Sequence, residues 1–299
     1  MKITVLTSLY RSVSYLEGYF ECVQKLNKRA DLEILLLHND PTPEEVGIIN
    51  QKLPDLSFVK YIPIPVRENL YATWNRGVDL AKGEYIAVWN VDDVRFSDSL
   101  DKQAAVLDEN PDILLTYGDF FYMFRYLDIS DKMVCNADYD LDKSSFYHSH
   151  QIGCFPMWRK SLHMKYGYFD EQFKLVADFD FQIRIARTGR IKKTSGVLGA
   201  YLENVPGKLS SNMWLQVSER NVIYWRYAVL SIVNWCTLFT IVRNYKIFSV
   251  RKQKGWFPLR NIFAGYLSFW WKRFPSLLVS IIYQPRYLGA FVKHNLLKQ

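Results

Sequence analysis

Short apolar runs alternate with amphipathic helical patterns along the first half of the chain, and this alternation constrains the fold more than any other feature. Helix-forming segments separate four runs rich in Val, Ile, Leu and aromatic residues, which predict strands over residues 3–7, 32–37, 58–64 and 85–89. Because repeated strand–helix units place their strands side by side, we expect a parallel sheet with helices on both faces.

Local signals set the ends of the predicted helices. Ser14 and Glu17 have the spacing of a capping box, and Thr42 with the following Pro-Glu-Glu predicts a second helix start. The third helix, over residues 70–81, is expected to end at Gly83. Beyond the fourth strand we expect a helix over 97–109, extended chain over 113–117 and 155–158, and an irregular aromatic segment over 120–150.

The strand over residues 85–89 leads directly into two adjacent carboxylates, Asp92 and Asp93. The carboxyl ends of parallel strands are the edge where open α/β sheets bind ligands. A hard divalent cation held by one or two carboxylates and by substrate phosphates needs this arrangement. The pair therefore predicts a cation site for a nucleotide diphosphate, while capping of the following helix is the alternative role.

A second acidic cluster, GYFDE at 167–171 and VADFD at 176–180, contains Asp178 at the start of a predicted helix. A helix cap lowers the pKa of a carboxylate, whereas burial and a neighbouring diphosphate raise it toward the range of a general base. The pattern leaves both roles open. His148 and His150 have the spacing of one strand face, but with no third ligand nearby we expect surface or acceptor-loop histidines rather than a metal pair.

Four motifs in this order resemble glycosyltransferase family 2, the inverting nucleotide-sugar enzymes with the GT-A fold. The resemblance covers about residues 3–212 and rests on VLTSLYRS, EILLLHND, GVDLAKGEYIAVWNVDD and GYFDEQFKLVADFDFQIRIARTG. In the same order, these four motifs match the family's first strand and its loop, its second strand with the base-binding acids, its metal-binding DxD stretch and its acceptor-side block. The resemblance implies an α/β fold of the GT-A class, a Rossmann-like mixed sheet flanked by helices.

The resemblance also assigns roles to individual positions. Asp92 and Asp93 correspond to the residues that hold Mg²⁺ or Mn²⁺ against the donor diphosphate, and Asp178 corresponds to the base that deprotonates the acceptor hydroxyl. Arg184, on the same helix as Asp178, is expected to be structural. The positions expected to bind the donor are Thr7, Leu9, Asn39, Asp40, Asn75, Arg76, Asn90, Val91 and Asp92.

Several positions depart from the family pattern. Asn90 stands in place of the first aspartate of DxD, and its amide can bond a ribose hydroxyl but brings no charge to a metal. Asn39 replaces a base-binding aspartate while Asp40 lies one position late, so either residue is a candidate for reading the base. No arginine precedes Asn75, and Arg76 is the expected substitute.

The implied reaction moves a sugar from a nucleotide-diphosphate donor to a hydroxyl of a glycan or lipid-linked acceptor, in the assembly of a cell-surface polysaccharide. Attack from the face opposite the diphosphate inverts the anomeric centre, and one such displacement needs one base. The alternative is a catalytically silent GT-A-like module at the membrane. Asn90, Asn39 and Ala177, which replaces a common glutamate, keep this alternative open.

The charge of the chain is divided unevenly, which predicts a catalytic domain over residues 1–212 and a basic, aromatic helical region over 213–299. The first part has 25 Lys and Arg against 29 Asp and Glu, whereas the second has 13 against the single Glu219 and holds six of the nine tryptophans. Basic residues beside Trp and Tyr favour a surface on anionic lipid headgroups. Packing on the catalytic core or on a sister subunit of a homo-oligomer is the alternative, and nucleic acid is not an expected partner.

Membrane attachment is expected to be peripheral. The uncharged run over residues 227–242 is shorter than the roughly 20 apolar residues of a membrane span. The N-terminus lacks the pattern of a signal peptide, and the four cysteines are widely spaced, which suits a reducing compartment. We therefore expect a cytoplasmic protein on the inner face of the membrane.

Overall fold

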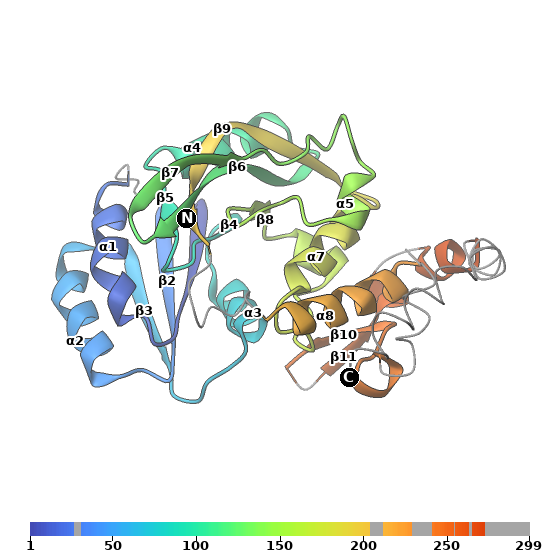
Figure 1. Cartoon of the computed structure of the whole chain (residues 1–299), viewed down its shortest axis with the longest axis horizontal. Helices are drawn as coiled ribbons and strands as arrows, with labels where there is room; N and C mark the ends of the chain where they lie inside the picture. The colour runs from blue at the N-terminus through green and yellow to red at the C-terminus, as the bar shows by residue number, and fades with distance from the viewer. Residues whose placement is uncertain (27–30, 204–211, 229–240, 254, 263–264, 273–299) are drawn as a thin grey trace, which may run out of the picture.

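A twisted mixed sheet forms the centre of the molecule (Figure 1). The computed structural model describes residues 1–26, 31–203, 212–228, 241–253, 255–262 and 265–272. Within these residues the sheet has nine strands, in the order β3-β2-β1-β4-β8-β6-β9-β5, with β7 beside β6. Their bounds are β1 Ile3–Leu9, β2 Leu32–Asn39, β3 Val59–Ile64, β4 Tyr85–Val88, β5 Val94–Arg95, β6 Ile113–Arg125, β7 Asp128–Val134, β8 Met157–Arg159 and β9 Arg190–Leu202.

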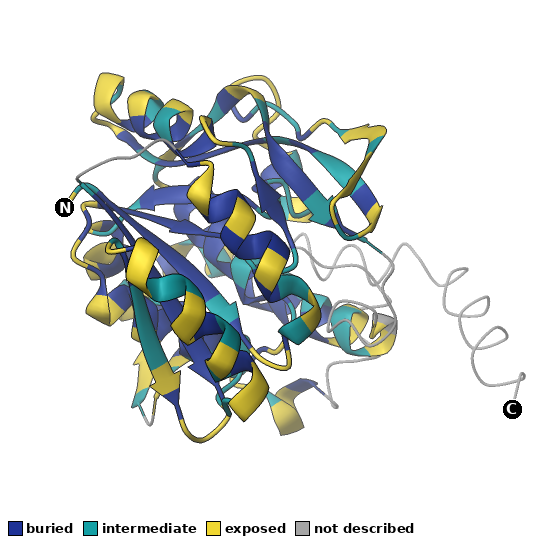
Figure 2. Cartoon of the chain, turned by 90° about the vertical axis from the view of Figure 1, so that its left-hand side faces the viewer, coloured by how far each residue is buried: buried dark blue, intermediate teal, exposed yellow. Residues whose placement is uncertain are grey.

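Helices cover both faces of this sheet, as the strand–helix alternation predicts. The helices that precede the C-terminal region are α1 Val13–Gln24, α2 Pro43–Lys52, α3 Leu70–Leu80, α4 Ser99–Glu109, α5 Ser145–His148, α6 Leu162–Tyr166 and α7 Ala177–Ala186, and a short 3₁₀ helix spans Leu53–Asp55. Helices α1, α2 and α4 share one apolar core with the sheet, and α3, α6 and α7 share the other. Figure 2 shows the exposed outer faces of the helices over the buried strands.

Alternating side chains of the inner strands supply both cores. In β1, Val5 belongs to the core with α1 and Leu6 to the core with α3; in β4, Ala87 and Val88 divide in the same way. Successive side chains of a strand point to opposite faces, so a sheet covered on both sides needs continuous apolar runs. Strands β1 to β4 are parallel to one another, and β8 runs antiparallel between β4 and β6.

The helix starts and ends follow the local signals in part. The capping box at Thr42 and Glu45 is confirmed, with bonds in both directions. The box expected at Ser14 is wrong, because α1 begins at Val13 and Ser14 lies inside it. Helix α3 ends at Leu80, before Gly83. Gly83 is needed for another reason, since a Cβ there would lie 2.5 Å from the amide nitrogen of Thr4.

The expectation of an irregular segment over residues 120–150 is wrong in its first part. Strand β6 continues to Arg125 and forms a hairpin with β7, whose first residue is Asp128. Register shifts between Phe121 and Met123 and between Met123 and Arg125 break the regular alternation. Such bulges remove the period of two on which strand prediction depends.

The C-terminal region packs against α7 (Figure 1). It contains α8 Met213–Arg226, the hairpin of β10 Ser249–Lys252 and β11 Gly255–Pro258, and α10 Leu259–Ile262. Among the described residues, no helix has the length and apolarity to cross a membrane. Most of the uncharged run over 227–242, and residues 204–211 before the predicted division, lie outside the described residues, so the division at residue 212 stays a prediction.

Candidate active site

A cavity of about 290 Å³ lies where the carboxyl end of β4 meets α3, α7 and α8. Asn90, which follows β4, and Asp178, in the first turn of α7, both line it. These two residues are 88 positions apart in the chain. The structure thus brings a polar residue at the ligand-binding edge of the sheet and the predicted base to a single cavity.

Asp178 is held with its carboxylate partly exposed to this cavity. The helix begins at Ala177 with Val176 as its N-cap, so Asp178 is not the cap residue. Its Oδ1 atom accepts hydrogen bonds from the Tyr71 hydroxyl (3.2 Å) and the Phe179 amide (2.8 Å). Burial and the nearby Asp178 carboxylate raise the pKa of Tyr71 well above its ordinary value, which keeps the hydroxyl protonated as a donor.

His150 lies on the other side of the same carboxylate. Its Nε2 atom is 3.7 Å from Oδ2 of Asp178, and the imidazole also lines the cavity. This distance exceeds a hydrogen bond but a small movement would close it. Of His148 and His150, His150 is therefore the one that lies at the candidate site. The sequence pattern predicted surface or acceptor-loop histidines and did not distinguish the two.

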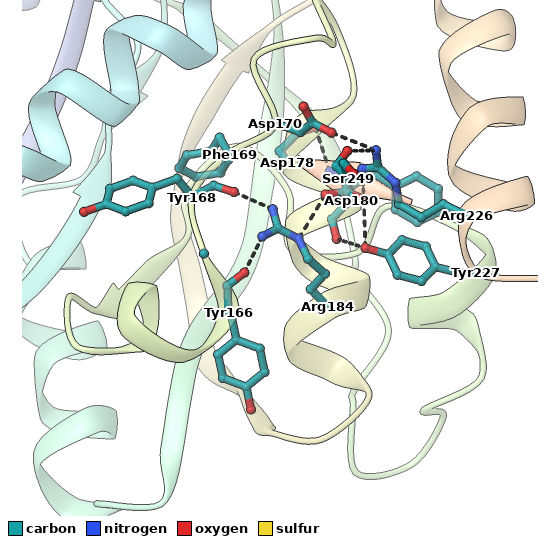
Figure 3. Close-up of polar contacts among 12 residues, drawn as sticks. Tyr166, Tyr168, Phe169, Asp170, Asp178, Asp180, Arg184, Arg226, Tyr227 and Ser249 are labelled. Carbon is teal, nitrogen blue, oxygen red and sulfur yellow. Dashed lines mark hydrogen bonds and ion pairs between the residues drawn. The ribbon is translucent and has the colours of Figure 1, made fainter. Parts of the chain in front are cut away.

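A buried ion network fixes the helix that carries Asp178 (Figure 3). Arg226 of α8 bonds Asp170 and Asp180, both at 2.8 Å, and the side chains of all three are buried. Arg184 pairs with Asp180 at 3.0 Å and donates to the carbonyl groups of Tyr166 and Tyr168. Although burial opposes ionisation, Arg226 and Arg184 lower the pKa of Asp180. The expectation that Arg184 is structural is confirmed.

The two carboxylates after β4 have different surroundings. Asp93 is 1% exposed, and its oxygens accept hydrogen bonds from the Asn90 amide group and the Leu202 backbone amide, both at 3.2 Å. Asp92 is only partly buried. The described residues contain no group of three or more His, Cys, Asp or Glu side chains that would hold a metal by themselves. Asp93 therefore shapes the turn from inside, and Asp92 is the better placed of the two for a ligand.

Two predicted donor-binding asparagines bond to other parts of the protein through both the amide nitrogen and the carbonyl oxygen of their side chains. The side chain of Asn75 donates to the Phe169 carbonyl and to Glu171, and accepts from the Phe169 amide, at 2.8–3.0 Å. Asn39 donates to Thr73 and accepts from the Glu68 amide, both at 2.9 Å. Both side chains are buried and join segments that are distant in the chain.

The other predicted donor positions lie around the same sheet edge without lining the cavity. Thr7 is buried and shares a 2.8 Å hydrogen bond with Tyr19, and Leu9 and Val91 belong to the apolar core. Asp40 forms an exposed ion pair with Arg11 at 2.7 Å. Arg76 pairs with Glu68. Of the predicted site residues, Asn90 and Asp178 are the ones that the cavity brings together.

Helix α8 supplies further cavity residues that the sequence reasoning missed, including Gln216 and Arg220. Next to them, the buried Glu219 accepts hydrogen bonds from the amides of Lys174 and Leu175, both at 2.8 Å. Glu219 thereby fixes the loop that leads to Asp178. A single acidic residue in a basic tail is the signal that was available for this role.

The sheet order, the polar edge after β4 and the carboxylate on α7 define a GT-A glycosyltransferase fold. A model of the family described as "Glycosyl transferase family 2" matches residues 4–167. The chain belongs to this family, as its motifs predict.

Two curated relatives are similar over part of their length. A "PGL/p-HBAD biosynthesis glycosyltransferase" of Mycobacterium bovis is 29% identical over 157 residues, which are 52% of this chain and 58% of the relative. An "Uncharacterized glycosyltransferase" of Haemophilus influenzae is 26% identical over 121 residues, 40% of this chain and 47% of the relative. The chain thus spans about half the length of the curated relatives it matches.

Solved structures share the fold at low sequence identity. S. aureus TarS 1-349 in complex with UDP-GlcNAc has a TM-score of 0.59 and 16% identity, covering 75% of this chain and 70% of that chain. The mannosyltransferase PcManGT from Pyrobaculum calidifontis, in complex with GDP-Man and Mn²⁺, has a TM-score of 0.53 and 14% identity, covering 94% and 74%. These similarities establish the GT-A architecture.

Proposed function

We propose that this protein is an inverting glycosyltransferase that moves a sugar from a nucleotide-diphosphate donor to a hydroxyl group. The observation that carries the proposal is the single cavity lined by Asn90, at the ligand-binding edge of the sheet, and by Asp178, on α7. Family membership and the nucleotide sugars bound by TarS and PcManGT support it.

In the proposed reaction Asp178 accepts the proton of the acceptor hydroxyl. The oxygen forms a bond to the anomeric carbon while the bond from that carbon to the diphosphate breaks on the opposite face, so the configuration inverts. Tyr71 holds one carboxylate oxygen of Asp178, which leaves the other oxygen toward His150 and the cavity. General-base catalysis of this kind contributes about 10²- to 10⁴-fold to a rate.

A divalent cation, Mg²⁺ or Mn²⁺, belongs to the proposal. The partly buried Asp92 would hold it together with the donor diphosphate, since Mg²⁺ commonly takes one or two carboxylates and completes its shell with phosphates and water. When bound, the ion neutralises the charge that develops on the leaving diphosphate. The Asn90–Asp93 hydrogen bond keeps the turn after β4 in place beside it.

We further propose that the acceptor is a glycan or a lipid-linked molecule of cell-surface polysaccharide assembly, used at the inner face of the membrane. Support comes from the C-terminal region, where Trp214 and Trp271 are 80% and 79% exposed. Exposed tryptophans among basic residues favour the interface of an anionic bilayer. Flotation with liposomes that contain anionic lipid tests this part, and a protein that stays unbound contradicts it.

Calorimetric titration with UDP, GDP and dTDP in the presence of Mn²⁺ tests the central proposal. We expect one nucleotide to bind, and we expect Asp178→Asn to keep that affinity while losing turnover. The rival function is a silent GT-A-like module, which the internally bonded Asn39 and Asn75 favour. Absence of binding for all three nucleotides supports the silent module and contradicts the enzyme.

A further inference from the structure

The cavity beside Asp178 carries more positive than negative charge. Among its lining residues the acidic side chain is Asp178, whereas Lys174 and Arg220 contribute two cations. Lys174 belongs to the loop before α7 and Arg220 to α8. A substrate that carries only uncharged hydroxyl groups does not need two cations in its binding cavity.

The segments that carry the two cations are held together by Glu219, the residue before Arg220 on α8. The carboxylate of Glu219, buried beneath α8, accepts the amides of Lys174 and Leu175, both at 2.8 Å. Its oxygens are thus engaged by the backbone of the loop. Arg220 follows Glu219 directly, and Gln216 lies one helical turn earlier, where residues four apart share a helix face. These bonds hold the backbone of the Lys174 loop against α8, and both Lys174 and Arg220 line the cavity.

Neither cation has a carboxylate within ion-pair distance in the part of the chain that the structure describes. The Nε atom of Arg220 is buried and has no hydrogen-bond partner there. A buried donor without an acceptor is unfavourable, and more so when the group is charged. A ligand with a negatively charged oxygen would satisfy it, and guanidinium groups suit phosphate and carboxylate in particular.

The position of the cations indicates the acceptor rather than the donor. In an inverting displacement the acceptor attacks from the face opposite the diphosphate, and the proposed diphosphate side is the turn of Asn90 and Asp92 after β4. Lys174 instead belongs to the loop that leads to Asp178, and Arg220 follows Glu219, which holds that loop. The remaining wall includes Trp158 and Phe120, whose rings suit an apolar or sugar face.

We propose that Lys174 and Arg220 form an anion subsite for the acceptor, so that the enzyme glycosylates a hydroxyl group near a phosphate or a carboxylate. This inference rests on the proposed function of the same cavity. It adds the chemical class of the acceptor, which the family match does not specify.

Binding of small probes to the UDP-saturated full chain tests the inference, since UDP then occupies the donor side. The probes are glycerol 1-phosphate and glucuronate, with glycerol and glucose as their neutral counterparts and inorganic phosphate as a third anion, measured by ligand-observed NMR. We expect at least one organic anion to bind about tenfold tighter than its neutral counterpart, as one charge-assisted hydrogen bond contributes. Which anion binds distinguishes a phosphate from a carboxylate acceptor.

Matched variants locate the effect. Arg220→Gln and Lys174→Gln should each weaken the anionic probe about tenfold. Arg220→Lys, which keeps the charge, should retain part of the affinity, and it also shows whether a loss in Arg220→Gln reflects misfolding. The control is Arg125→Gln, on an exposed side chain that does not line the cavity, which should bind the probe like the wild type.

Three outcomes overturn the inference. One is equal binding of anionic and neutral probes. Another is a loss of UDP affinity in the Arg220 and Lys174 variants, which would assign the cations to the donor diphosphate. The third is inorganic phosphate binding as tightly as the organic anion that binds best, which would describe a simple anion site. Failure of the proposed function itself is distinguishable, because then UDP, GDP and dTDP would all fail to bind the wild type.

Discussion

Nε2 of His150 lies 3.7 Å from Oδ2 of Asp178, so the predicted base has an imidazole beside the oxygen that Tyr71 does not hold. This contact joins the loop after α5 to the first turn of α7. After a small movement that closes this distance, the imidazole can orient the carboxylate and receive a hydrogen bond from it once the carboxylate has accepted a proton.

We therefore expect His150→Ala to lower kcat by about tenfold or more, with little change in the KM for the donor. The measurement is steady-state kinetics of the variant beside the wild type, with kcat and the donor KM determined separately. His148→Ala is the matched control, because His148 is exposed and does not line the cavity. Equal effects of both substitutions, or a change confined to KM, would contradict this role.

The ion network around Arg226 should be essential for stability. Arg226→Met leaves Asp170 and Asp180 buried without their main cation, and removal of one partner of a buried ion pair costs about 3–5 kcal/mol. Urea unfolding measures the loss. Arg125→Met, whose side chain is 87% exposed, should change the free energy of unfolding by less than about 0.5 kcal/mol. Partial restoration of stability in Arg226→Met with Asp170→Asn would confirm that an unpaired buried carboxylate contributes to the loss, while Asp180 is kept as the partner of Arg184.

His163 should make stability depend on pH. Its Nε2 atom accepts from the Trp158 indole at 2.9 Å, and burial lowers the pKa of His163 from 6.5 to about 3. The unfolded chain thus binds a proton below about pH 6.5 that the folded chain does not bind, so this stability is present above that pH and is lost as the pH falls toward 3. Between pH 6.5 and about pH 5 the loss is about 2 kcal/mol.

Urea midpoints at about pH 7.5 and pH 5 check this sign and size. Other groups contribute equally to wild type and variant, so the informative quantity is the difference in pH dependence between the wild type and His163→Gln. The variant should lose about 2 kcal/mol of that dependence. A wild-type dependence that persists unchanged in His163→Gln would show that the buried imidazole is not responsible.

Asn75 and Asn90 should separate structure from donor binding. Asn75→Ala removes three buried hydrogen bonds and should lower the free energy of unfolding by about 2–4 kcal/mol, with UDP affinity changed less than about twofold. Asn90→Ala, at the cavity, should weaken UDP by about fivefold or more with a smaller effect on stability. Calorimetric titration and urea unfolding give both quantities, and the opposite pattern would restore Asn75 to the donor site.

Asp92 and Asp93 should also differ, with Asp92 acting on donor binding and Asp93 on stability. Asp92→Asn is expected to remove most of the Mn²⁺-dependent part of UDP affinity, a loss of about tenfold or more that EDTA reproduces in the wild type. Asp93→Asn should act mainly on stability, because its buried carboxylate accepts the Leu202 amide and the Asn90 side chain. If Asp93→Asn abolishes the metal effect while Asp92→Asn does not, their roles are reversed.

Local patterns were sufficient for the elements that the chain forms with its near neighbours. The apolar runs predicted strands β1 to β4, and the Thr42–Glu45 box predicted the start of α2, since both signals lie within a few residues. The β6–β7 hairpin was missed because its bulges interrupt the alternation. Its strand pairing is nevertheless regular enough to extend the sheet.

The candidate site was predictable where a motif names the residue, as for Asp178 and Asn90. The partners of these residues were not, because Tyr71, His150 and Arg220 reach the cavity from elements far apart in the chain. The role of Asn75 depends on Phe169 and Glu171, which lie more than 90 positions later. No periodic signal encodes such long-range pairs.

The presence of Glu219 and Arg226 on one helix has a consequence for engineering. Glu219 accepts backbone amides of the loop before Asp178, and Arg226 pairs with the carboxylates of Asp170 and Asp180. A chimera that carries the C-terminal region of another transferase would also need the acidic residues and the loop that contact that region. A variant truncated before α8 would likewise lose the contacts that position Asp178, so the catalytic domain depends on its C-terminal region.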